Sequence, residues 1–174
     1  MLLKKDLMAT FLGSLAFLAT FVAEYFHIAP RVIGIGVGFL VLFCSNFLGK
    51  RQAFLYVLIL TILAVLFLNP IVALKYFLLY LLMPLLLAIG DGKLSLKILT
   101  LIIGSGGIFL YLLAYLKYFK FIYILSYKIN SIGYLTVIAI FGAAVYYLIL
   151  TYGWTYIRKN IPANFLNYLS NILD

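Results

Sequence analysis

The chain has 174 residues, of which 67% are hydrophobic and 10% are charged, and its formal net charge is +9. Soluble domains are about 45–50% apolar and about 25% charged, and a soluble domain of this size could not bury so much apolar surface. The composition excludes a soluble enzyme, a disordered chain and a secreted disulfide scaffold. It predicts an all-α integral membrane protein in which residues 1–174 form a single domain.

Six apolar stretches are long enough to cross a bilayer, which takes about 20 residues. Proline, glycine, asparagine and basic residues separate them. We expect the six transmembrane helices to pack as one bundle, with no internal repeat, linker or second domain. The expected spans cover residues 7–28, 32–48, 53–68, 71–90, 96–116 and 132–157.

Two further segments are too polar or too short to be spans. In residues 117–131, Tyr and Phe alternate with Lys, which is typical of the membrane–water interface. This segment is either an aromatic anchor or a lid over an outward-facing site. Residues 160–174 predict a C-terminal amphipathic helix, capped by Asn160 with Pro162 in its first turn. We expect this helix to lie on the inner leaflet or on a partner.

The basic residues predict the topology. Six spans place both termini on one side of the membrane, and the positive-inside rule assigns the more basic side to the cytoplasm. The side with the termini carries eight Lys and Arg residues and the other side carries five, so we expect cytoplasmic termini in the cell membrane. The eight are Lys4, Lys5, Lys50, Arg51, Lys93, Lys97, Arg158 and Lys159; the five are Arg31, Lys75, Lys117, Lys120 and Lys128. The positive charge therefore indicates lipid head groups rather than nucleic acid.

Few residues are suited to catalysis or metal binding. The acids are Asp6, Glu24, Asp91 and Asp174, with one histidine, His27, and one cysteine, Cys44. No acidic pair has helical spacing, and one histidine cannot form a multi-histidine metal site. We therefore expect no enzymatic activity, no metal and no cofactor.

Polar residues gather at the outer ends of the first and fourth spans. Glu24 and His27 are three residues apart and would share a helix face, and Arg31 follows the bend at Pro30. Ionisable groups in membranes are costly and mark functional sites. The alternative is an interfacial ion pair between Glu24 and Arg31 that only ends the helix.

Asn69 and Lys75 should lie on the same outer side. Lys75 lies five residues into the fourth span. Its side chain can snorkel to the surface, meet an anionic substrate or pair with Glu24.

Glycines in the second and fifth spans predict close helix packing. Gly34 and Gly38 form a small-residue face, and Gly104-Ser105-Gly106-Gly107 predicts tight packing, a kink or a cavity wall. Ser105 would bond either a ligand or its own helix. This stretch superficially resembles the serine motif of rhomboid proteases, but no histidine follows His27, so we expect no protease activity.

Small residues also line the inner half of the first span, at Ala9, Gly13 and Ala16. Such a strip lets another helix approach closely. That helix belongs either to this chain or to a partner.

Together these features resemble the S components of energy-coupling-factor vitamin transporters. That family has six spans, docks its coupling subunit through an Ala-rich strip in the first span and binds substrate at the outer end. Residues 68–80 are also similar to a pattern in uncharacterised membrane families related to S components. The resemblance implies that Ala9, Gly13 and Ala16 dock a coupling subunit. It also implies that Glu24, His27, Arg31, Asn69, Lys75 and Ser105 bind a small hydrophilic ligand.

The sequence thus leaves three hypotheses. The first is the substrate-binding component of a vitamin-like uptake transporter, which relies on separate ATPases because this chain has no phosphate-binding loop. The second is a non-catalytic accessory subunit of a larger membrane complex. The third is a lipid-handling or lipid-modifying enzyme, which the small number of acids disfavours.

Overall fold

A computed structural model gives the fold. It describes residues 2–90, 94–119, 122–124, 127–129, 131–162, 164–165, 167–168 and 171. For residues 118–119, 122–124 and 127–129 it describes the backbone alone.

Within these residues, six helices are long and apolar enough to cross a membrane, which confirms the six predicted spans. By this criterion the chain is a multi-pass membrane protein. The spans are α1 (Leu2–Tyr25), α2 (Pro30–Phe43) with η1 (Cys44–Leu48), α3 (Lys50–Phe67), α4 (Pro70–Lys75) with η2 (Tyr76–Leu82) and α5 (Met83–Ile89), α6 (Leu94–Phe119) and α7 (Ile132–Asn160). The segments η1 and η2 are π-helical.

The first span ends at Tyr25, three residues earlier than predicted. The chain then turns through His27 (φ 56°) and Ala29 (φ 43°), both in the left-handed region. Pro30 disfavours a helical conformation at the residue before it, and it also suits the first turn of the next helix. The turn therefore falls between residues 25 and 30, and α2 begins at Pro30.

A short β-hairpin follows α6 and was not predicted. Strand β1 (Ile122–Ile124) pairs antiparallel with β2 (Tyr127–Ile129), with Tyr123 opposite Lys128. Aromatic and β-branched residues favour such strands. The segment 117–131 is thus not a span, and the question of anchor or lid stays open because most of its side chains lie outside the described residues.

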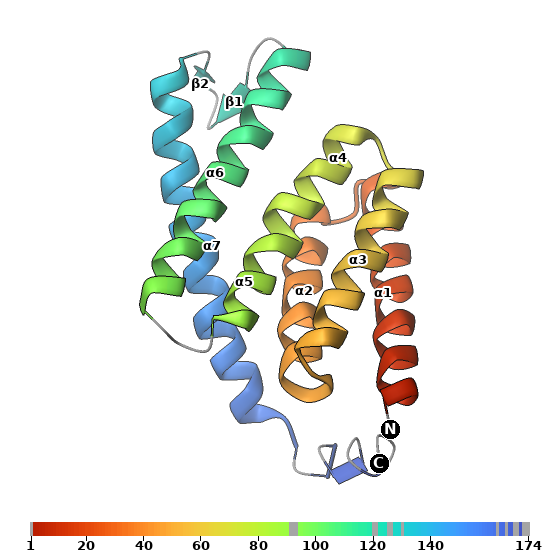
Figure 1. The fold of residues 1–174 in the computed structure, drawn as a ribbon. Helices are drawn as coiled ribbons and strands as arrows, with labels where there is room; N and C mark the ends of the chain where they lie inside the picture. The colour runs from red at the N-terminus through yellow and green to blue at the C-terminus, as the bar shows by residue number, and fades with distance from the viewer. Residues whose placement is uncertain are drawn as a thin grey trace.

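The fourth span lies between two groups of helices (Figure 1). On one side α1 packs closely against α3, with α2 beside them, and on the other side α6 packs against α7. Leu81 and Leu85 of the fourth span belong to the hydrophobic cluster of α1, α2 and α3, whereas Tyr76, Tyr80 and Met83 belong to the cluster that includes α6 and α7. The fourth span therefore joins the two halves of the molecule.

Glycines permit the closest of these contacts, as predicted. A Cβ on Gly34 would lie 2.4 Å from the ring of Tyr80, and one on Gly38 would lie 2.6 Å from the hydroxyl of Tyr146. In α6, a Cβ on Gly104 would lie 2.4 Å from the sulfur of Met83. The glycine faces of α2 and α6 are packing faces.

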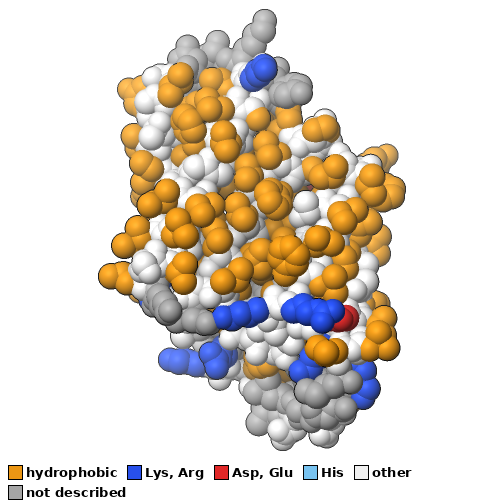
Figure 2. Space-filling view, viewed as in Figure 1, with side chains coloured by type: hydrophobic (Ala, Val, Ile, Leu, Met, Phe, Trp, Pro, Cys, Tyr) orange, Lys and Arg blue, Asp and Glu red, His pale blue; other side chains and the backbone are white. Residues whose placement is uncertain are grey.

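Basic residues mark one end of the molecule. The start of α1, the turn between α2 and α3, the start of α6 and the end of α7 lie at this end (Figure 1), which we call the basic end. Figure 2 shows Lys and Arg gathered there, below a face that is mostly hydrophobic. The opposite end carries the turn between α1 and α2 and the start of α4, and we call it the far end. This distribution follows the charge pattern used to predict the topology, and the cytoplasmic orientation stays a prediction.

Of the predicted C-terminal amphipathic helix, residues 164–165, 167–168 and 171 are helical, and residues 163, 166, 169–170 and 172–174 lie outside the described residues. Asn160, its expected cap, instead ends α7, and its side-chain amide donates to the carbonyl of Tyr156 (2.8 Å). The last span is therefore three residues longer than predicted.

Candidate functional site

The structure pairs Glu24 with Lys75 at the far end. The Lys75 ammonium donates to the Glu24 carboxylate, which joins α1 to the last residue of α4. The two side chains are 14% and 17% exposed. Since Lys75 lies five residues after Pro70, the pair is about 7.5 Å along the helix from its start. Of the alternatives for Lys75, the structure shows the pairing with Glu24.

Two further polar residues, Tyr76 and Thr20, lie next to Lys75 and one helical turn before Glu24, respectively. Tyr76, next to Lys75, is fully buried, and its hydroxyl donates to the carbonyl of Pro30 (3.3 Å). The Lys75 nitrogen lies 5.0 Å from the centre of the Tyr76 ring, a cation–π distance. Thr20, one helical turn before Glu24, is fully buried, and its hydroxyl has no hydrogen-bond partner among the described residues. We call Thr20, Glu24, Lys75 and Tyr76 the far-end polar cluster.

His27 and Arg31 lie outside the Glu24–Lys75 pair, and their role in ligand binding stays a prediction. Because α1 ends at Tyr25, His27 no longer shares a helix face with Glu24, and it is exposed in the turn. Arg31 is also exposed, and the Glu24 carboxylate is paired with Lys75 instead. The sequence argument had extended the helix through residue 28.

Asn69 and Ser105 have local structural roles. The Asn69 side-chain oxygen accepts from the backbone N–H of Ile71 (3.0 Å), so Asn69 caps α4. The Ser105 hydroxyl donates to the carbonyl of Ile102 (2.9 Å) in its own helix. Of the alternatives for Ser105, the structure therefore shows the bond to its own backbone.

The strip of Ala9, Gly13 and Ala16 is buried within the chain. Ala9 is fully buried, Ala16 is 4% exposed, and a Cβ on Gly13 would lie 3.4 Å from the side chain of Ile59 in α3. The close packing of α1 against α3 uses these small residues. Of the two alternatives for this strip, the structure shows a helix of the same chain, α3, packed on it.

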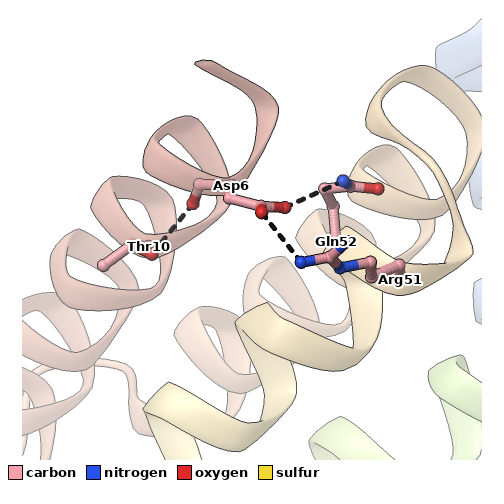
Figure 3. Close-up of polar contacts among 4 residues, drawn as sticks. All are labelled: Asp6, Thr10, Arg51 and Gln52. Carbon is pink, nitrogen blue, oxygen red and sulfur yellow. Dashed lines mark hydrogen bonds and ion pairs between the residues drawn. The ribbon is translucent and has the colours of Figure 1, made fainter. Parts of the chain in front are cut away.

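A polar contact between α1 and α3 lies at the basic end (Figure 3). The Asp6 carboxylate accepts from Arg51 (3.1 Å) and from the side-chain amide of Gln52 (2.9 Å). Gln52 is 3% exposed, whereas Arg51 is mostly exposed. The buried bond to Gln52 is thus the stronger tie, because exposed ion pairs contribute little. These three residues were not among the predicted site residues.

A cavity of about 330 Å³ lies at the basic end, between η1, α5, α6 and α7. This volume falls in the range of small-molecule pockets. Its polar lining comes from the first turn of α6, the last turns of α7 and the end of α2 with η1. The polar and aromatic residues are Asn46, Lys97, Thr100, Tyr147, Thr151, Trp154, Thr155 and Arg158. We call this the basic-end cavity.

Sequence reasoning could not assemble this cavity. Lys97 and Arg158 were used only for topology, because each lies at the end of a different span and 60 residues of chain separate them. One sequence pattern could have indicated the cavity. Each basic residue has a threonine one helical turn away, Thr100 for Lys97 and Thr155 for Arg158. Only the packing of α6 against α7 brings the two groups to one cavity.

Within the described residues no three His, Cys, Asp or Glu side chains gather as a metal site would require. Comparison with protein-family models, with curated proteins and with solved structures found no match. The functional argument therefore rests on the far-end polar cluster and the basic-end cavity.

Proposed function

We propose that this chain is the substrate-binding membrane component of a small-molecule uptake transporter, and that a separate subunit supplies the energy. The observation that carries the proposal is the largely buried Glu24–Lys75 pair between the first and fourth spans. The proposal assigns no reaction to the chain itself.

A buried ion pair in a span is costly to maintain. Removing two charges from water costs several kcal/mol per ion, and two apolar side chains would join the helices about as well (~0–4 kcal/mol in their favour). Ionisable groups within spans are accordingly rare and mark substrate or ion pathways. The presence of the pair thus supports a role beyond holding α1 against α4.

The pair has the chemistry to recognise a charged ligand. A ligand carboxylate or phosphate would compete with Glu24 for the Lys75 ammonium, and a ligand amine would compete with Lys75 for Glu24. The Thr20 hydroxyl is buried and has no partner in the part of the chain that the structure describes, so it can form a further hydrogen bond. Exchange of partners at the pair would change the contact between α1 and α4 and so signal that the site is filled.

A second candidate is a non-catalytic accessory subunit of a larger membrane complex. The observation that favours it is the exposure of α6 and α7. In the apolar stretch of each helix, only 17% of the residues of α6 and 22% of those of α7 are buried inside the chain. Lipid would cover these faces in a transporter component, and neighbouring proteins would cover them in an assembly subunit.

The test is native mass spectrometry of the protein purified from its own membranes in a mild detergent. The transporter proposal predicts a bound small molecule, a coupling subunit with ATPases, or both. A fixed stoichiometric complex of other membrane proteins without a small ligand would reject it in favour of the accessory subunit.

A further inference from the structure

The basic-end cavity lies at the opposite end of the molecule from the Glu24–Lys75 pair. Its lining contains two cationic side chains, Lys97 and Arg158, both exposed. No carboxylate among the described residues lines it. Asp6 is bonded to Arg51 and Gln52, and Glu24 is bonded to Lys75. The described lining thus has an uncompensated positive charge.

The three threonine hydroxyls of the cavity already donate their protons within their own helices. Thr100 donates to Leu96 (2.7 Å), Thr151 donates to Tyr147 (2.8 Å) and Thr155 donates to Thr151 (2.7 Å). The Asn46 amide likewise donates to Leu42 (2.8 Å). These bonds leave Lys97, Arg158, the indole N–H of Trp154, the Tyr147 hydroxyl and the second N–H of the Asn46 amide as donors for a ligand.

This donor set fits an oxyanion. Lysine and arginine bind phosphate oxygens through charge-assisted hydrogen bonds, and the planar arginine group can form two at once. A cationic ligand would meet two like charges and no carboxylate in the described lining. We propose that the basic-end cavity binds a phosphate-type oxyanion, held by Lys97 and Arg158.

The position of the cavity indicates a lipid head group as the source. The lining includes Gly90 at the end of α5, Lys97 in the first turn of α6 and Arg158 in the last turn of α7. Helix ends lie at the membrane–water interface, where basic pockets between spans bind anionic head groups. The remaining lining is apolar, from Leu42, Leu86, Leu87, Leu96 and Leu150, and suits the start of acyl chains.

The chain provides its own probe for this site. Trp154 is the single tryptophan of the sequence and lines the cavity. Its fluorescence therefore reports on this site without labelling. The test reconstitutes the full chain in phosphatidylcholine vesicles with increasing fractions of phosphatidylglycerol and follows the emission of Trp154. A parallel titration adds inorganic phosphate to vesicles of phosphatidylcholine alone.

The variants K97Q and R158Q are compared with K159Q. Lys159 is adjacent to Arg158 and equally exposed, but it does not line the cavity. Because each Lys or Arg near an anionic lipid surface contributes about 1 kcal/mol, we expect each cavity variant to need about fivefold more phosphatidylglycerol for half of the change. K159Q should follow the wild type. Size-exclusion profiles check that each variant is folded.

Two results would overturn the proposal. One is an absence of any response to phosphatidylglycerol and to phosphate in the folded wild type. The other is an equal loss in K159Q and in the cavity variants, which would reduce the effect to the general charge of the basic end. A response to phosphate alone would keep the oxyanion site but reject the lipid as its source. All of these outcomes are independent of the proposed transport function.

Discussion

At the scale of single residues, the charged side chains divide into two kinds. Glu24 and Lys75 are largely buried and bonded to each other. Arg31, Lys97 and Arg158 are exposed. A buried charge depends on its partner, because an unpaired charge in a low-dielectric setting is strongly unfavourable. The two kinds of residue should therefore respond differently to substitution.

The first prediction concerns the buried pair. E24Q leaves the Lys75 ammonium without its counter-charge and should lower the free energy of unfolding by about 3 kcal/mol. The double variant E24Q/K75M removes both charges and should be close to the wild type. Thermal unfolding in detergent measures both. Additive losses in the double variant would show that the two groups do not interact.

The same scale shows why the predicted site was only partly correct. The sequence placed Glu24 and Lys75 on the same side of the membrane, and the fold joins them. It could not show that the helix stops at Tyr25, because the left-handed conformation of His27 depends on the turn to Pro30. His27 was therefore expected on the helix face of Glu24, although α1 ends before it.

At the scale of secondary-structure elements, small residues determine which helices approach each other. Ala9, Gly13 and Ala16 bring α1 to α3, and Gly34 and Gly38 bring α2 to Tyr80 and Tyr146. The strip in α1 was correctly predicted to be a contact surface. Its partner was not determined by the sequence, because a small-residue face has the same pattern whether the approaching helix is internal or external.

The second prediction uses two glycines of α2. In G34A the new methyl group would lie 2.4 Å from the Tyr80 ring, whereas the same change at Gly36 meets no atom within 4 Å. Overpacking costs about 1–3 kcal/mol, while alanine favours a helix over glycine by about 1 kcal/mol. G34A should therefore melt at a lower temperature than the wild type, and G36A at an equal or higher one. Equal melting temperatures for the two variants would contradict this packing.

At the scale of the whole molecule, the six spans follow directly from the hydrophobic pattern. Their number was predicted because each apolar stretch is long enough and is bounded by Pro, Gly or basic residues. The basic-end cavity was not predicted, since it depends on contacts among α5, α6 and α7 that no local pattern specifies. The number of spans could thus be predicted from the sequence, while the basic-end cavity could be found only in the packed structure.

The third prediction concerns orientation. We expect the basic end to face the cytoplasm. With the buried Cys44 replaced by Ala, single cysteines are placed at Lys4, Lys117 and Lys159. A membrane-impermeant maleimide applied to intact cells should label only the cysteine at position 117, and permeabilised cells should label all three. Labelling of positions 4 and 159 in intact cells would reverse the topology.

The central claim is that the Glu24–Lys75 pair binds a transported ligand, and E24Q/K75M tests it most directly. Wild type and double variant are purified from the native membranes in parallel, and native mass spectrometry measures the small molecule that each retains. Our account predicts a ligand on the wild type and at least about a tenfold loss from an equally stable double variant. Equal retention by both proteins would contradict it and leave the pair a structural tie between α1 and α4.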